Sequence, residues 1–153
     1  MTDQAAVPEK SLAIGTAEDA DSRGIVGLWE RCELTRPWND PHADLVRART
    51  GPNSAVLVGR DGSAIVATVM VGHDGHRGWV YYVAVDPDQH KKGYGRAIMT
   101  AAEDWLRARG IEKLQLLVRA DNIRVQAFYE TLGYDQQERV IYAKWLDGRD
   151  PTP

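Results

Sequence analysis

Two glycines one residue apart, Gly93 and Gly95, stand between a run of strand-type residues and a stretch with helical periodicity. Residues 80–85 are apolar, β-branched or aromatic, and apolar residues recur at helical spacing from Tyr94 onward. The pattern predicts a strand, a glycine loop and a helix. Glycine lets the backbone approach a ligand closely, and the first turn of a helix offers unpaired N–H groups at the positive end of its dipole. Such a loop suits a phosphate or pyrophosphate.

Other glycine motifs fit less well. The dinucleotide fingerprint asks for a small residue three positions after the second glycine, and that position holds Ile98. A nucleoside triphosphate loop needs Gly-Lys followed by Ser or Thr, and the chain contains no Gly-Lys pair. Taken alone, the two glycines are equally compatible with a tight helix start that binds nothing. The surrounding elements must decide between the two interpretations.

The elements that would position this loop follow from apolar periodicity and turn residues. An Asp-Gly pair at 61–62 predicts an antiparallel hairpin, and the prolines at 37 and 41 separate two helices. A strand, helix and strand in succession favour a parallel pair, so we expect a mixed sheet. The predicted helices begin at Thr16 or Asp19 and end at Cys32, cover 42–49, run from Tyr94 to about Gly110, and run from Asp121 or Asn122 to Leu132. The predicted strands cover 11–15, 55–58, 64–71, 79–85, 113–118, 134–137 and 140–146.

Composition sets the broad class. The 153 residues suffice for one domain with a real core, which we expect at 11–147 between tails at 1–10 and 148–153. A net charge of −3 argues against a nucleic-acid partner, and no apolar run approaches a membrane span. A single cysteine and no signal-type N-terminus predict a cytoplasmic protein. We expect a monomer or a homodimer.

A second motif follows the loop. Asn122 precedes Ala127, Phe128 and Tyr129, and Gly133 and Tyr134 close the segment. Together with the glycine loop, this pattern resembles the paired signature of the GCN5-related N-acetyltransferase (GNAT) family. One departure is His90, which stands where the family usually has Gln or Arg. The segments 36–41 and 74–78 also resemble the small bacterial YpeA-type subgroup of that family.

The resemblance covers roughly residues 12–145. It implies an α/β (α+β) fold with a mixed, mostly antiparallel sheet of six to seven strands and about four helices. The sheet would splay between its fourth and fifth strands, where acetyl-coenzyme A (acetyl-CoA) lies. The fourth strand would pair by backbone with the pantetheine arm, and the loop N–H groups would hold the pyrophosphate. The predicted cofactor-binding residues are Val83, Ala84, Val85, His90, Lys91, Lys92, Gly93, Tyr94, Gly95, Arg96, Asn122 and Tyr129.

Tyr129 is the predicted catalytic acid. A phenol of ordinary pKa about 10 can protonate a departing thiolate whose thiol has a pKa of about 8.5. Without the resemblance, a core aromatic beside Phe128 would be the simpler interpretation. Asn122 is either a helix cap or a cofactor contact, and the two roles are compatible.

The base that deprotonates the acceptor amine is not identified, because residues 79–85 contain no carboxylate. The candidates are Glu33, Asp40, Asp74, His76 or a water relay. Arg36 and Trp38 are candidate walls of the acceptor pocket, or simply pack the turn between two helices. The predicted substrate residues are Arg36, Trp38, Asp40, Asp74 and His76. The pair His73 and His76 with Asp74 is a turn rather than a metal site, and no metal is expected.

The predicted function is an acetyl-CoA-dependent N-acetyltransferase acting on an amine of a small molecule, protein or peptide. Direct attack in a ternary complex is expected, since Cys32 lies far from the loop in sequence and no covalent-catalysis motif is present. The missing carboxylate in the fourth strand favours an alternative, a non-catalytic acetyl-CoA-binding regulatory or interaction module. A hydride-transferring dinucleotide enzyme is a more distant third interpretation.

Overall fold

The computed structural model describes residues 12–151, and these divide into two compact units at Leu116 and Leu117. Whether residues 11–147 form one domain, as expected from the sequence, stays a prediction. In the first unit the strands are β1 (Ala13–Thr16), β2 (Ser54–Asp61), β3 (Ala64–His73), β4 (Gly78–Val85) and β5 (Leu114–Gln115). Its helices are α1 (Ser22–Arg31), α2 (Pro41–Thr50) and α3 (Tyr94–Arg107), and α4 (Ile123–Thr131) lies in the second unit.

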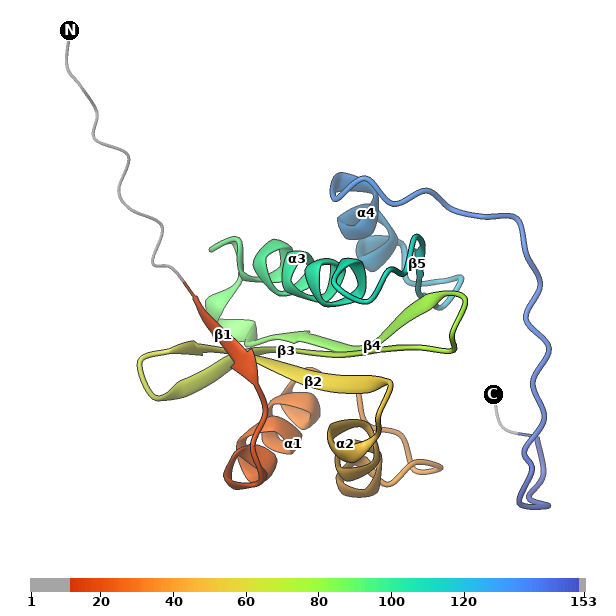
Figure 1. Cartoon of the computed structure of the whole chain (residues 1–153), viewed down its shortest axis with the longest axis horizontal. Coiled ribbons are helices and arrows are strands. Elements are labelled where there is room, and N and C mark those ends of the chain that lie inside the picture. Colours follow the sequence, from red (N-terminus) through yellow and green to blue (C-terminus); the bar gives the residue numbers. More distant parts are fainter. Residues whose placement is uncertain (1–11, 152–153) are drawn as a thin grey trace, which may run out of the picture. The chain divides into compact units, whose positions relative to one another are not determined.

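The first unit is a sheet with helices on both faces. Its strands follow the order β1-β2-β3-β4-β5, with antiparallel pairs from β1 to β4 and a parallel β4–β5 pair. Helices α1 and α2 lie on one face and α3 lies on the other (Figure 1). Because α3 connects β4 to β5 across that second face, the two strands run parallel. The mixed, mostly antiparallel sheet predicted from the sequence is therefore confirmed.

Local sequence signals account for the element boundaries. Gly62 closes the β2–β3 hairpin with a φ of 63°, in the left-handed region that glycine adopts without strain. Pro41 occupies the first turn of α2, and the Asp40 side chain accepts the N–H groups of His42 and Ala43. These are the first orphan donors of the helix, so Asp40 serves as its N-cap.

The core of the first unit lies on both sides of the sheet. Trp29 and Ile25 on α1 are fully buried against the sheet, and Ile98 and Met99 on α3 are buried on the opposite face. The apolar residues whose spacing predicts these two helices are thus the residues that pack against the sheet. The first helix begins later than expected, because residues 19–21 form a short 3-10 helix before Ser22.

Gly78 marks a close approach between β4 and α3. A Cβ atom on Gly78 would lie 2.5 Å from Cδ1 of Leu106, a side chain that is only 2% exposed. We expect Gly78→Ala to lower the free energy of unfolding by about 1–3 kcal/mol, as overpacking does in closed cores. Urea denaturation measures this loss of unfolding free energy. Gly15→Ala is the control, because a Cβ at Gly15 would have no described neighbour within 4 Å. Equal stability of the two variants would contradict the close packing.

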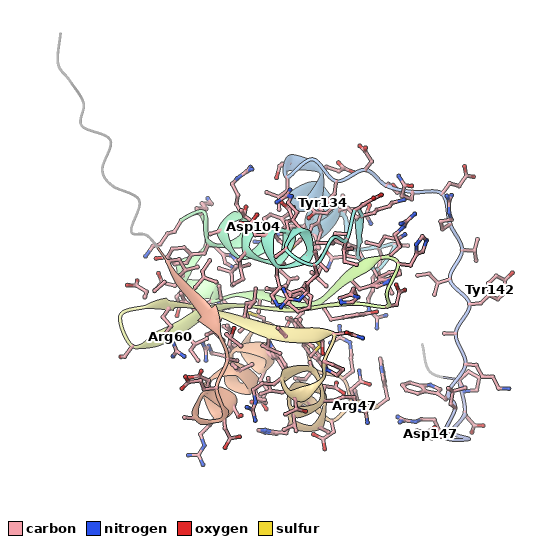
Figure 2. All side chains as sticks on the ribbon, in the orientation of Figure 1. Arg47, Arg60, Asp104, Tyr134, Tyr142 and Asp147 are labelled. Carbon is pink, nitrogen blue, oxygen red and sulfur yellow. The ribbon has the colours of Figure 1, made fainter. Side chains whose placement is uncertain are left out.

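The predicted strand count is wrong. Within residues 12–151 the sheet has five strands rather than six to seven, because residues 134–137 and 140–146 are neither helix nor strand. Most of their apolar and aromatic side chains are exposed, with Val140 at 81% and Tyr142 at 94%, and Figure 2 shows Tyr142 projecting from this stretch. Residues of high strand propensity form a strand only where a neighbouring strand pairs with them. No strand in the described part of the chain pairs with these residues. The predicted strand at 113–118 shortens to two residues, and Ser11 of the predicted strand 11–15 lies outside the described residues.

Candidate active site

Strand β4 has an open edge along most of its length. It pairs with β5 only at Gly78 with Leu114 and at Trp79 with Gln115. From residue 80 to residue 85, β3 is its only strand partner among the described residues. This divergence is the splay predicted between the fourth and fifth strands. Backbone groups of this stretch that point away from β3 therefore have no strand partner among the described residues, and the predicted cofactor residues Val83, Ala84 and Val85 lie in it.

The open edge leads directly into the glycine loop. Asp86 begins the loop by accepting the N–H of Asp88, and α3 begins at Tyr94. Lys91 and Gly93 both adopt left-handed backbone conformations, with φ values of 67° and 77°. Alternating conformations of this kind turn successive N–H groups toward one side, where they form a concave site for an anion. That this loop binds a phosphate stays a prediction, and its two left-handed residues are the observation that favours it.

Side chains of the loop divide between solvent and core. His90, Lys91, Lys92 and Arg96 are exposed, and the Lys92 ammonium donates to Oε1 of Gln89 at 2.6 Å. Tyr94 is only 3% exposed, and its hydroxyl lies 3.5 Å from Oδ2 of Asp61. Only the backbone of Tyr94 is therefore available to a ligand, while its ring anchors the start of α3.

The end of α1 is tied to the end of β4. The Cys32 thiol donates to the Val85 carbonyl at 3.3 Å, and Arg31 pairs with Asp86 at 3.0 Å. A cysteine distant from the loop in sequence thus lies beside the predicted cofactor edge. Burial raises the pKa of the Cys32 thiol, which keeps it protonated, whereas a nucleophilic cysteine needs a depressed pKa. Cys32 is a packing contact in this position.

The second unit carries the two remaining cofactor candidates. Asn122 is the N-cap of α4, and its side chain accepts the Val125 N–H at 3.2 Å. Tyr129 is 9% exposed, and its ring meets Phe128 and Tyr134 edge-on at centroid distances of 5.1 and 5.9 Å. Burial raises the pKa of Tyr129 to about 12. Tyr129 is therefore both a core aromatic and a phenol that keeps its proton at neutral pH.

The acceptor candidates come from two different loops. On the loop between α1 and α2, the Arg36 guanidinium donates to the carbonyls of Glu33 and Thr35 at 2.8 and 2.9 Å, and Trp38 is half-buried. Asp40 on the same loop is committed to capping α2.

The other two candidates lie in the turn between β3 and β4. Asp74 accepts the N–H groups of Arg77 and His76, and these two bonds hold the pKa of Asp74 below its usual range. A carboxylate held in this way is a weaker base. His76 is exposed in the same turn. Throughout residues 12–151, no group of three or more His, Cys, Asp or Glu side chains could hold a metal ion.

Sequence reasoning missed a cluster behind β4. Tyr82, predicted only to lie in the strand 79–85, stacks on Trp29 at a centroid distance of 3.9 Å and donates to Oδ2 of Asp44 at 2.8 Å. Thr68 joins them through the indole N–H of Trp29. The four residues come from four separate elements, and no local spacing relates them. The sequence therefore offers no signal that would have found the cluster.

Comparisons with known proteins identify the family of this chain. The family model described as "Acetyltransferase (GNAT) family" matches residues 25–134. An acetyltransferase of Yersinia enterocolitica is 40% identical over 135 residues, which are 88% of this chain and 96% of that protein. No helix among the described residues is long and apolar enough to cross a membrane.

Solved structures share the fold. The ribosomal-protein-S18-alanine N-acetyltransferase of Escherichia coli matches with a TM-score of 0.71 and 25% identity, covering 91% of this chain and 88% of that one. AAC(6')-Iy, solved in complex with the bisubstrate analogue CoA-S-monomethyl-acetylneamine, matches with a TM-score of 0.76 and 16% identity over 88% and 98% of the two chains. With the family model matching most of its length, this chain belongs to the acetyltransferase (GNAT) family.

Proposed function

We propose that this acetyltransferase moves the acetyl group of acetyl-CoA to an amine of a small molecule, protein or peptide by direct attack in a ternary complex. The observation that carries the proposal is the open edge of β4, which continues into a loop with left-handed Lys91 and Gly93 at the start of α3. An edge strand suits an amide-containing extended arm, and the loop suits a pyrophosphate. Acetyl-CoA carries both groups in that order.

Each part of the site has a separate task. The N–H groups from Lys91 to Arg96 hold the pyrophosphate, and exposed Lys91, Lys92 and Arg96 add positive charge around it. The backbone of 83–85 pairs with the pantetheine arm, and one N–H of this segment polarises the thioester carbonyl. When bound, acetyl-CoA supplies the activated acetyl group. Asn122 caps α4 and thereby orients the helix that carries Tyr129.

Tyr129 serves as the acid for the leaving group. As the amine nitrogen bonds to the acetyl carbon, the carbon–sulfur bond breaks and the thiolate takes the phenolic proton of Tyr129. The nitrogen releases its own proton to water, and solvent later returns a proton to Tyr129. The pKa of about 12 ensures that Tyr129 carries this proton at any physiological pH. The raised pKa of Cys32 supports direct attack over an acyl-cysteine route.

The loop can be tested by replacing Gly93 with alanine. No described atom lies within 4 Å of a Cβ placed on Gly93, but its φ of 77° strains any side chain by about 1 kcal/mol. The loop would relax away from its anion-binding shape. We expect Gly93→Ala to weaken acetyl-CoA binding about tenfold, measured by isothermal calorimetry.

Gly62→Ala is the matched control. Gly62 has a φ of 63° and equally open space around it, but it lies in the β2–β3 turn. Both variants should lose similar stability, and only Gly93→Ala should lose affinity. Equal acetyl-CoA affinity in all three proteins would remove the loop from the proposal.

A non-catalytic acetyl-CoA-binding module remains the alternative function, favoured by the lack of any carboxylate on β4. The two functions share the binding site and differ in turnover. Acetyl-CoA binding without transfer to any amine would favour the module.

A further inference from the structure

Strand β4 carries a bulge at the middle of its open edge. Thr68 of β3 faces Ala84, whereas Met70 faces Tyr81. Val69 therefore faces two residues, Tyr82 and Val83, which is the definition of a β-bulge. Tyr82 adopts a φ of 50°, a left-handed conformation that bulky residues rarely adopt. Such a backbone persists only where surrounding contacts hold it.

The contacts that hold Tyr82 come from α1, α2 and β3. Its ring lies flat on the fully buried indole of Trp29, with 3.9 Å between centroids and 14° between planes. The indole N–H donates to the Thr68 hydroxyl at 2.9 Å, and that hydroxyl donates to the Tyr82 carbonyl at 3.0 Å. The Tyr82 hydroxyl donates to Oδ2 of Asp44 at 2.8 Å. Ring, carbonyl and hydroxyl of Tyr82 are thus each fixed by a different neighbour.

The bulge determines which N–H and C=O groups of residues 83–85 point toward the open edge of β4. One extra residue shifts the frame of β4 by one position, so residues 83–85 present different N–H and C=O groups than an unbulged strand would. Burial and the adjoining Asp44 carboxylate raise the pKa of Tyr82, and its hydroxyl keeps the proton that Asp44 accepts. The Tyr82–Asp44 bond is therefore present across the physiological pH range.

We propose that Tyr82 is a positioning residue for acetyl transfer, clamped between Trp29 and Asp44 so that residues 83–85 meet the acetyl-bearing arm of the cosubstrate. The inference rests on the proposed function, because it assigns a support to the same strand edge. Tyr82 and Asp44 act through the backbone of β4 and need not touch either substrate.

Calorimetric titration with two probes tests this clamp, which consists of Tyr82 and its contacts with Trp29 and Asp44. Acetyl-CoA engages both the loop and the β4 edge, whereas ADP supplies an adenosine pyrophosphate without the arm. We expect Tyr82→Phe and Asp44→Ala each to raise the Kd of acetyl-CoA about tenfold and to leave the Kd of ADP within about twofold. Asp44→Asn should restore most of the affinity, because its amide oxygen accepts the same hydrogen bond. The double variant should match the single ones, since both remove one bond.

Tyr81→Phe is the matched control, because this neighbour on β4 is 50% exposed and lies outside the clamp. It should bind both probes as the wild type does. Wild-type affinity for acetyl-CoA in Tyr82→Phe and Asp44→Ala would overturn the inference and leave the proposed function standing. An equal loss for acetyl-CoA and ADP would also overturn it, since it would mean a general structural effect. Absence of acetyl-CoA binding by the wild type would overturn the proposed function, and the clamp with it.

Discussion

Replacing Tyr129 with phenylalanine is expected to lower kcat for acetyl transfer about a hundredfold and to leave the KM for acetyl-CoA nearly unchanged. The change removes the proton that the leaving thiolate would take, while the ring keeps its edge contacts with Phe128 and Tyr134. A loss confined to kcat is typical of an interaction made in the transition state rather than in substrate binding. Release of the CoA thiol with a responding amine measures the effect.

Tyr142→Phe supplies the control for this experiment. Tyr142 belongs to the same unit but is 94% exposed, so its hydroxyl has no place in the proposed chemistry. This variant should turn over at the wild-type rate. Full turnover by Tyr129→Phe at saturating acetyl-CoA would remove Tyr129 as the acid and return it to a core aromatic.

The buried phenol of Tyr129 should also make stability fall at alkaline pH. Its pKa is raised from 10 in the unfolded chain to about 12 in the folded one, because burial disfavours the phenolate. Below pH 10 both states hold the proton, and this group leaves stability independent of pH. Between pH 10 and about 12 the unfolded state loses its proton first, so the folded state loses stability as pH rises. Two pKa units correspond to about 3 kcal/mol.

Urea denaturation of the wild type and Tyr129→Phe across about pH 8–12 isolates the contribution of the Tyr129 phenol to the free energy of unfolding. The difference in unfolding free energy between the two proteins should be constant up to about pH 10. It should then shift by about 3 kcal/mol in favour of the phenylalanine variant by about pH 12. A difference that stays flat over the whole range would show that Tyr129 titrates alike in both states and is not buried as described.

Features with local signals could be predicted from the sequence. Asn122 caps α4, and the helix after Gly93 begins at Tyr94, where apolar spacing places it. The splay beside β4 follows the family resemblance, and the hairpin at Gly62 follows from a turn dipeptide whose glycine adopts a positive φ. Apart from the splay, the deciding interaction in each case lies within a few residues along the chain.

Features that depend on distant residues could not be predicted. The left-handed Tyr82 is held by Trp29, Thr68 and Asp44, which only the folded sheet brings together. The contact between Cys32 and Val85 joins the end of α1 to the end of β4 in the same way. Residues 134–137 and 140–146 do not form the predicted strands. Their strand propensity is a local property, and it does not provide a neighbouring strand to pair with.

The release of the CoA thiol from acetyl-CoA, measured across a panel of amines, aminoacyl compounds and peptides, tests the central claim most directly. We expect release that depends on at least one amine, with an acetylated product seen by mass spectrometry and a rate that Tyr129→Phe lowers about a hundredfold. Calorimetric binding of acetyl-CoA with no thiol release for any member of the panel would contradict acetyl transfer and identify a binding module instead.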